Sequence, residues 1–198
     1  MLEIDKTGKV ISPMVRGAIA PMIEHAPMPV VKGIIVHQTN SPTAKATLNG
    51  YANLGANGAH FLIDKDGTIY QTASVYRKTY HVGKLRSRCY VEMRCEPAEM
   101  KANAKWNPGG AHQRESKKSA PDRYPSNDDA IGIEIVGMAY PVEGEDEDVF
   151  EPLTPQQQHS LKWLVSEIRE TLGVPLTEVF HHPEVSYKAK TEAKSAQW

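Results

Sequence analysis

The chain has 198 residues, of which 40% are apolar and 24% are charged, as in an ordinary soluble globular domain. Its 23 basic and 24 acidic residues give a formal net charge of −1, so overall charge provides no reason to expect nucleic acid or a membrane surface as a partner. Any binding specificity must come from a local site. Because no internal repeat or low-complexity linker is present, we expect one domain over residues 1–198.

The N-terminal segment lacks the features of a secretion signal. Glu3 and Asp5 stand where a signal peptide carries basic residues, and no apolar run follows them. No stretch approaches the roughly 18–20 apolar residues that cross a bilayer. We therefore expect a chain without a membrane span that is made in the cytoplasm and needs another route if it acts elsewhere.

The first part of the chain predicts short pieces, then a strand and a helix. Prolines are frequent in the first thirty residues and favour turns and extended segments over a long helix. Residues 30–38, "VVKGIIVHQ", are typical of a buried strand. Residues 41–55, "SPTAKATLNGYANLG", predict a helix with Ser41 as N-cap, Pro42 at its first position and Gly55 as its stop.

The middle of the chain predicts a hairpin, followed by a long polar segment. Residues 59–73, "AHFLIDKDGTIYQTA", contain two β-rich runs around an Asp-Gly pair, which is a strong hairpin signal. Residues 79–83, "TYHVG", predict another short strand. Residues 85–129 are rich in proline and polar residues without clear periodicity, which is typical of a functional lid or an insertion.

The last third returns to regular elements. Residues 130–137, "AIGIEIVG", predict a strand whose isoleucines face one way and Glu134 the other. A helix is predicted from the Thr154 cap and Pro155 to Gly173, with an apolar stripe along one face. Strands that alternate with helices favour the α/β class, and the hairpin requires a central mixed β-sheet flanked by helices.

The chain has two cysteines, Cys89 and Cys95, which are close enough in sequence to form a small disulfide loop. A disulfide in an oxidising compartment and a pair of free thiols are both open interpretations. Metal binding by this pair alone is the weakest of the three.

Four of the eight histidines stand beside predicted strands: His37, His60, His81 and His182. A single histidine at such a position usually belongs to the core or to a strand edge. Together with the acidic and basic residues Glu134, Lys190 and Glu192 they suggest a metal hydrolase site, because sites form where strand ends converge.

Six motifs in order carry a resemblance to a known family: "IIVHQT", "GAHFLIDKDGTIYQ", "HVGK", "AIGIEIVG", "TPQQQHSLKWLV" and "HHPEVSYKAKTE". The chain resembles the zinc-dependent N-acetylmuramoyl-L-alanine amidases and peptidoglycan recognition proteins from about residue 32 to 192. The resemblance implies their α/β fold, as a single amidase domain with an insertion at about residues 85–129. It also implies zinc as the cofactor and peptidoglycan or muropeptides as the substrate.

The resemblance implies a zinc site made of His37, His182 and Glu192. In the recycling members of the family a lysine follows the second histidine at the eighth position and an acidic ligand at the tenth. Counting from His182 reaches Lys190 and Glu192, whereas counting from His181 fits neither, so we expect His181 to be a neighbour. The family usually has aspartate or cysteine at the third ligand, and glutamate is one methylene longer.

The resemblance also implies the catalytic roles. Glu134 matches the acidic residue that recycling members place opposite the metal, with Gly132 and Gly137 leaving space around it. Ala59 occupies the position of the tyrosine used by phage-type members, so Glu134 is expected to act as the base. Lys190 is expected to stabilise the oxyanion. His60 and His81 either contact the substrate or fill the wall of the pocket.

These roles predict a hydrolase that cleaves the amide bond between N-acetylmuramic acid and L-alanine. Zinc would activate a water molecule, and Glu134 would transfer its proton to the leaving nitrogen. The alternative is a peptidoglycan-binding recognition module without catalysis. Trp106, in the insertion, is the one tryptophan that we would consider as a sugar platform rather than as packing.

The place of action stays open. Recycling of wall fragments in the cytoplasm, release as a phage endolysin, and injection into a rival's periplasm as an antibacterial effector all fit a chain without a signal peptide. The insertion and the two cysteines favour action on intact wall in the periplasm. An immunity or inhibitor protein is a candidate partner.

Overall fold

A six-stranded mixed sheet forms the centre of the computed structural model, which describes residues 1–198. Its strand order is β10-β4-β7-β5-β6-β3. Neighbours in the run β10, β4, β7 and β5 are parallel, whereas β6 is antiparallel to β5. The predicted mixed α/β sheet is confirmed. Its strands are β3 (Val15–Gly17), β4 (Gly33–Gln38), β5 (Phe61–Ile63), β6 (Ile69–Gln71), β7 (Ala130–Ile135) and β10 (Val179–His181).

The Asp-Gly turn produces the antiparallel pair, as predicted. Ile63 of β5 is paired with Ile69 of β6, and Gly67 between them has a φ angle of +83°. Only glycine adopts such a positive angle without a steric cost, so Gly67 allows the chain to reverse in this tight loop.

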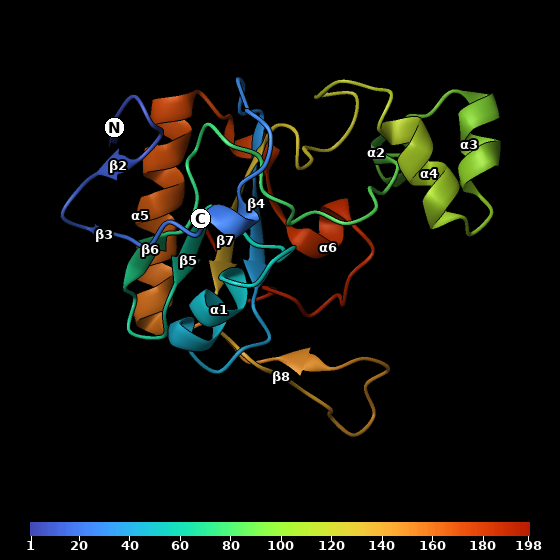
Figure 1. Ribbon diagram of the computed structural model, residues 1–198. Helices are drawn as coiled ribbons and strands as arrows, with labels where there is room; N and C mark the ends of the chain where they lie inside the picture. Colours follow the sequence, from blue (N-terminus) through green and yellow to red (C-terminus); the bar gives the residue numbers. More distant parts are fainter.

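The main core lies between the sheet and helix α5 (Pro155–Leu172), which covers one face (Figure 1). Thr154 and Gln157 form a reciprocal capping box at its start, and Gly173 ends it with a φ angle of +69°. Both ends are where the sequence predicts them. Alternate side chains of the central strands meet apolar side chains of α5 in this core, which includes Ile34, Val36, Ile131, Ile133, Ile135, Leu161, Leu164 and Ile168.

Two local predictions are wrong. Helix α1 (Ala44–Tyr51) begins after Pro42 and ends before Gly55. It is capped by Thr43, whose hydroxyl accepts a hydrogen bond from the Ala46 N–H, and not by Ser41. Ser41 instead forms a β-bridge with Gly137. Residues 79–83 form no strand.

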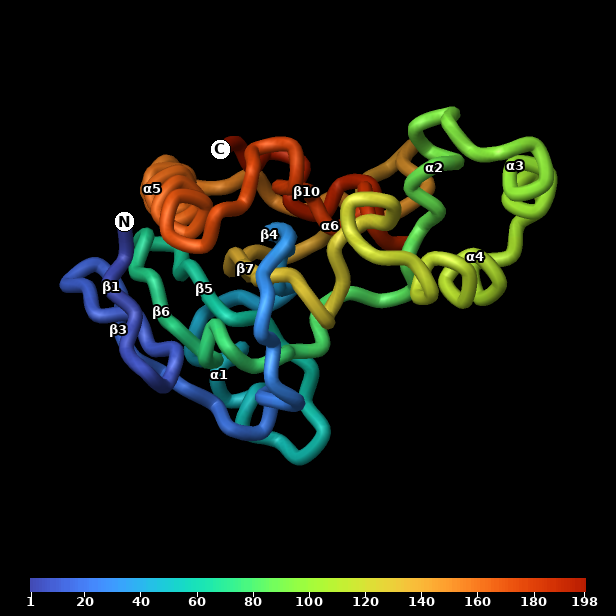
Figure 2. The backbone as a smooth tube through the Cα atoms, turned by 90° about the horizontal axis from the view of Figure 1, so that it is seen from above, coloured from blue at the N-terminus to red at the C-terminus, as the bar shows by residue number.

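The segment from 85 to 129 is also more regular than expected. It contains α2 (Arg88–Val91), α3 (Pro97–Asn103) and α4 (Pro108–Glu115), which lie together at a distance from α5 (Figures 1 and 2). None exceeds eight residues, and so short a helix shows no clear hydrophobic period. Cys89 and Cys95 form a disulfide in this segment.

No helix of the chain is both long and apolar enough to cross a membrane. Several short elements complete the fold. They are β1 (Glu3–Ile4), β2 (Val10–Ile11), η1 (Pro21–Ile23), β8 (Ala139–Tyr140), β9 (Val149–Phe150), η2 (Leu176–Glu178) and α6 (His182–Val185).

Candidate active site

A cavity of about 460 Å³ lies at the carboxyl end of the central strand β4. Parallel strands commonly place binding sites at this edge, because the loops that follow neighbouring strands meet there. Several polar side chains that line it come from distant parts of the sequence: His37, His81, Glu134, His182, Lys188 and Glu192.

Strand register brings the first two groups together. His37 of β4 is the direct partner of Glu134 in β7, so their side chains emerge on the same face of the sheet. On the other side of β4, β10 pairs in parallel and leads directly into His182, the first residue of α6. Three neighbouring strands thereby direct two imidazoles and one carboxyl group to one cavity.

His37, His182 and Glu192 form a buried cluster whose ligand atoms all lie within 4.8 Å of one another. The Nδ1 atoms of His37 and His182 face the same Glu192 oxygen, Oε1, at 3.6 and 2.8 Å. Two imidazoles and one carboxylate form a donor set that suits zinc. The cluster therefore fits a zinc ion, with three protein ligands as in catalytic zinc sites.

The hydrogen bonds of His81 fix the tautomer of His37. His81 Nε2 lies 3.2 Å from the carbonyl oxygen of Ala130, which only accepts, so a neutral His81 carries its proton on Nε2. Its Nδ1 then accepts from His37 Nε2, 2.9 Å away. With its proton on Nε2, the neutral His37 ring presents the lone pair of Nδ1 toward Glu192, as a metal ligand must.

Burial keeps His37 neutral. Removal from water, and secondarily the nearby His182, lowers the pKa of His37 to about 4 against the opposing effect of Glu192. A neutral imidazole is the form that coordinates a metal. For Glu192, burial alone would raise the pKa, but the 2.8 Å hydrogen bond with His182 opposes that effect and helps to hold the carboxyl ionised.

Gln38 positions the segment that carries Glu192. Its side-chain oxygen accepts from the Ala193 N–H at 3.2 Å, and its amide nitrogen donates to the Glu151 carbonyl at 2.8 Å. A Cβ at Gly137 would lie 2.1 Å from the Gln38 side chain, so glycine is needed there. The C-terminal segment is thus tied to the end of β4, next to His37.

Glu134 has the environment of a proton-transfer group. Burial, and secondarily the charge of Glu192, raises the pKa of Glu134 to about 8, although Lys188 opposes the shift. One carboxyl oxygen, Oε2, is buried without a hydrogen-bond partner. The neighbouring glycines do not serve Glu134 as expected. A Cβ at Gly132 would lie 2.8 Å from the His81 ring, so Gly132 makes room for His81.

The structure brings Lys188, rather than Lys190, to the cavity. Lys188 lines it, close enough to act electrostatically on His37 and Glu134. Lys190 is exposed, is not among the lining residues, and its backbone N–H donates to Glu147. The spacing of eight residues after His182 selects Lys190. Spacing alone does not show how the loop after α6 runs, and this determines which lysine faces the cavity.

Two other histidines lie outside the cavity. His60 is fully buried; its Nε2 pairs with the Arg77 carbonyl at 2.9 Å and its Nδ1 accepts from the Gly132 N–H at 3.0 Å. Of its two interpretations, the structure favours a buried packing role. His181 pairs with Glu184 at 3.0 Å and is no member of the metal cluster, as expected.

Tyr80 is a lining residue that no sequence pattern selects. It is 48% exposed at the cavity, and its ring stacks on His25 with centroids 3.8 Å apart. The side-chain oxygen of Asn127 accepts from the backbone N–H groups of His81 and Val82 and so fixes the adjacent wall. No local pattern links Asn127 to this wall.

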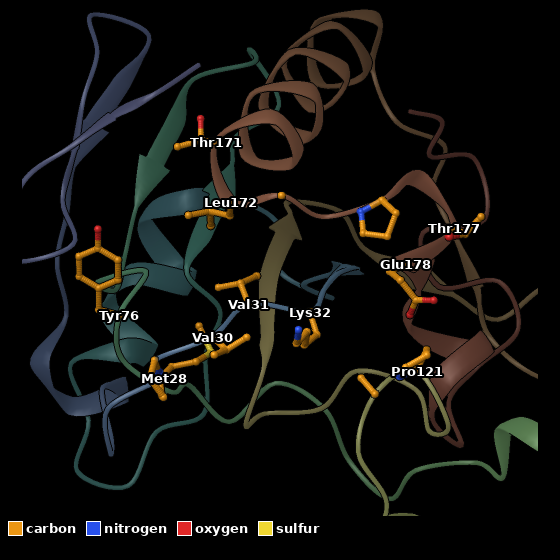
Figure 3. A pocket seen from close by; sticks show the side chains of 14 residues that line it. Met28, Val30, Val31, Lys32, Tyr76, Pro121, Thr171, Leu172, Thr177 and Glu178 are labelled. Atoms are coloured by element: carbon orange, nitrogen blue, oxygen red, sulfur yellow. The ribbon is translucent and has the colours of Figure 1, made fainter.

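A larger cavity of about 820 Å³ lies at the opposite end of β4 and has a different character (Figure 3). Its lining comes from the segment before β4 and from the end of α5, with Lys32 and Glu178 as its charged side chains. Glu178 is already paired with Arg88 at 2.9 Å. Size does not identify the active site here, because this cavity contains none of the chemistry described above.

Comparison with protein families gives one match. The model of the family described as N-acetylmuramoyl-L-alanine amidase matches residues 26–195. A comparison with curated protein sequences found no match.

Solved structures share the fold at low sequence identity. A selenomethionine derivative of AmpD is 18% identical, with a TM-score of 0.58 over 100% of this chain and 96% of that one. AmpDh3 from Pseudomonas aeruginosa, in complex with anhydromuramic pentapeptide, is 17% identical, with a TM-score of 0.53 over 96% and 61%. PlyL is 15% identical, with a TM-score of 0.52 over 90% and 85%. With the family model matching most of its length, the chain belongs to the N-acetylmuramoyl-L-alanine amidase family.

Proposed function

We propose that the protein is a zinc-dependent amidase that hydrolyses the bond between N-acetylmuramic acid and L-alanine in peptidoglycan. The observation that carries the proposal is the convergence of His37, His182 and Glu192 in the cavity that also contains the buried carboxyl group of Glu134. Family membership supports the reaction class. The complex of AmpDh3 with anhydromuramic pentapeptide supports the substrate class.

The zinc site and Glu134 have different roles in the proposed reaction. Zinc held by His37, His182 and Glu192 would supply a Lewis acid that activates water and polarises the carbonyl group. Glu134 takes the proton from the attacking water and returns it to the alanine nitrogen as the C–N bond breaks. Burial raises its pKa above the ordinary value of a glutamate, which brings proton uptake and release closer to neutral pH.

Charge on the substrate oxygen needs a further partner. Lys188 lines the cavity and carries the charge that such an oxyanion requires, so we assign this role to Lys188. Lys190, which the resemblance implies, is not among the residues that line the cavity. One well-placed donor of this kind is typically worth ~3–4 kcal/mol in the transition state.

We further propose that the protein acts on the wall outside the cytoplasm. The disulfide between Cys89 and Cys95 supports this, since such bonds persist in oxidising compartments and are rare in the cytosol. We expect protein recovered from the periplasm to retain the Cys89–Cys95 disulfide. In cytoplasmic extract the same disulfide should be reduced rapidly.

The decisive experiment is digestion of purified peptidoglycan followed by mass spectrometry of the soluble products. The expected products are free stem peptides that begin with L-alanine, together with glycan that keeps its lactyl groups. A chelator should stop the reaction and added zinc should restore it. Binding to the wall without release of peptides would support the recognition-module alternative and overturn the proposal.

A further inference from the structure

The α2–α4 segment forms a second, smaller hollow beside the active site. Its volume is about 130 Å³, and three aromatic residues line it: Tyr90, Trp106 and Tyr187. The cations Arg86 and Lys105 also line it, and no aspartate or glutamate does. The hollow is therefore aromatic and positively charged, on a chain whose overall charge is nearly balanced.

Trp106 is the most exposed aromatic residue of this hollow. It is 82% exposed, and its ring meets the Tyr187 ring nearly at right angles, at 82° with centroids 5.2 Å apart. A single exposed apolar side chain needs no explanation. Here, however, the exposed indole is held at a defined angle by a second ring and stands beside the exposed cation Lys105.

The hollow is built on a rigid base. Arg88 donates two hydrogen bonds of 2.9 Å to Glu178, the residue just before β10, and both side chains are buried. The Cys89–Cys95 disulfide closes the end of α2, and the Asn103 amide donates to the Ser87 hydroxyl at 3.1 Å. A preorganised surface loses little conformational entropy when it binds a ligand.

Two chain segments connect the hollow with the catalytic cavity. Lys188 lines the cavity and its neighbour Tyr187 lines the hollow; likewise Gly83 lines the cavity and Arg86 the hollow. The two segments are joined where the Arg86 N–H donates to the carbonyl oxygen of Val185 at 2.9 Å. The hollow thus lies next to the catalytic cavity, on the side of the α2–α4 segment.

We propose that this hollow is an outer subsite that binds the glycan strand of peptidoglycan beyond the muramic acid whose amide is cleaved. This inference rests on the proposed function. The C–H face of a sugar ring packs on an aromatic ring such as Trp106, and Arg86 and Lys105 donate hydrogen bonds to hydroxyl and acetamido oxygens. The hollow would then bind only polymeric substrate, whereas a single muropeptide unit fills only the catalytic cavity.

A sedimentation assay with insoluble sacculi tests binding without catalysis. The background is Glu134→Gln, which prevents digestion, and Trp106→Ala is added to it. Stacking of one ring predicts about a tenfold weaker apparent Kd. Trp106→Phe should recover part of the loss. Tyr76→Ala is the matched control, because Tyr76 is an exposed aromatic residue at the other cavity (Figure 3) and should bind like its parent.

A second assay separates the glycan from the stem peptide. Trp106→Ala in the active enzyme should lower kcat/KM about tenfold on sacculi and leave it unchanged on disaccharide-peptides prepared with a muramidase. Equal loss on both substrates, or unchanged binding to sacculi, overturns the subsite. Equal thermal midpoints for Trp106→Ala and wild type ensure that the loss is not one of folding.

The two assays keep this inference distinct from the proposed reaction. If the wild-type protein cleaves neither substrate but Trp106→Ala weakens its binding to sacculi, the proposed hydrolysis fails and the subsite stands. If the wild-type protein cleaves both and Trp106→Ala changes neither binding nor turnover, the subsite fails and the hydrolysis stands.

Discussion

His37 on β4 and Glu134 on β7 are direct partners across two parallel strands at the centre of the sheet. Backbone hydrogen bonds therefore fix the position of the proposed metal ligand His37 relative to the carboxyl group that we propose as the base. Functional groups on strands are held more firmly than groups on loops. This pair is the rigid part of the active site, and His182, Lys188 and Glu192 come to it from the C-terminal segment.

Glu134→Gln should separate catalysis from metal binding. The amide keeps the shape of the side chain but cannot accept a proton, so turnover on peptidoglycan should fall by about 100-fold or more. Zinc content, measured by elemental analysis, should stay at the wild-type value because Glu134 is outside the ligand cluster. A variant that digests peptidoglycan at nearly the wild-type rate would remove Glu134 from the role of base.

Glu192→Ala should reduce zinc content, because it removes one of three ligands. Glu184→Ala is the matched control. Glu184 pairs with His181 in the same way as Glu192 pairs with His182, but at a position outside the cluster. Competition with a chromophoric chelator measures both. Equal zinc affinity in the two variants would mean that Glu192 is not a ligand.

The two lysines give opposite predictions. Lys188→Ala should lower kcat by about 100-fold, as expected for loss of one donor to a developing oxyanion. Lys190→Ala should change kcat by less than about threefold, because Lys190 does not line the cavity. Steady-state kinetics on a soluble muropeptide distinguishes them. The reverse order would return the role to Lys190, as the family resemblance implies.

Much of the fold follows from local signals. The Asp-Gly hairpin, the capped helix α5 and the alternation in β7 each have a short-range cause, and all three occur where the sequence predicts them. The cap of α1 was harder to predict, because Ser41, Pro42 and Thr43 are all acceptable near a helix start. Tertiary pairing of Ser41 with Gly137 leaves the cap to Thr43.

The active site was predictable only in part. His37, His182 and Glu192 stand in motifs, and the structure brings them together. The position of Lys188 and the role of His81 depend on how two loops run. No residue pattern predicts the path of these loops. Lys188 and Lys190 are only two residues apart, but only Lys188 lines the cavity.

His60 should make the fold acid-sensitive. Burial lowers the pKa of His60 to about 4 from 6.5, so in the unfolded chain it binds a proton at a higher pH than in the folded one. The contribution of neutral His60 to the free energy of unfolding is therefore fully present above about pH 6.5. It is lost as the pH falls toward 4, by up to about 3 kcal/mol. His60→Gln should make this decline shallower in urea titrations with chelator present, whereas the exposed His159→Gln should not. Equal slopes for the wild type and His60→Gln would contradict the assignment.

His81→Phe should weaken zinc binding although His81 is not itself a ligand in the cluster. The Phe ring fills the space beside Gly132 but cannot accept the proton of His37 Nε2, so the His37 tautomer that frees Nδ1 is no longer favoured. Loss of such a partner typically costs 10–100-fold in metal affinity. His81→Asn, whose side-chain oxygen is able to accept the same proton, should recover part of the loss. A purely steric role for His81 would produce the reverse order: wild-type affinity in the Phe variant and weaker binding in the smaller Asn variant.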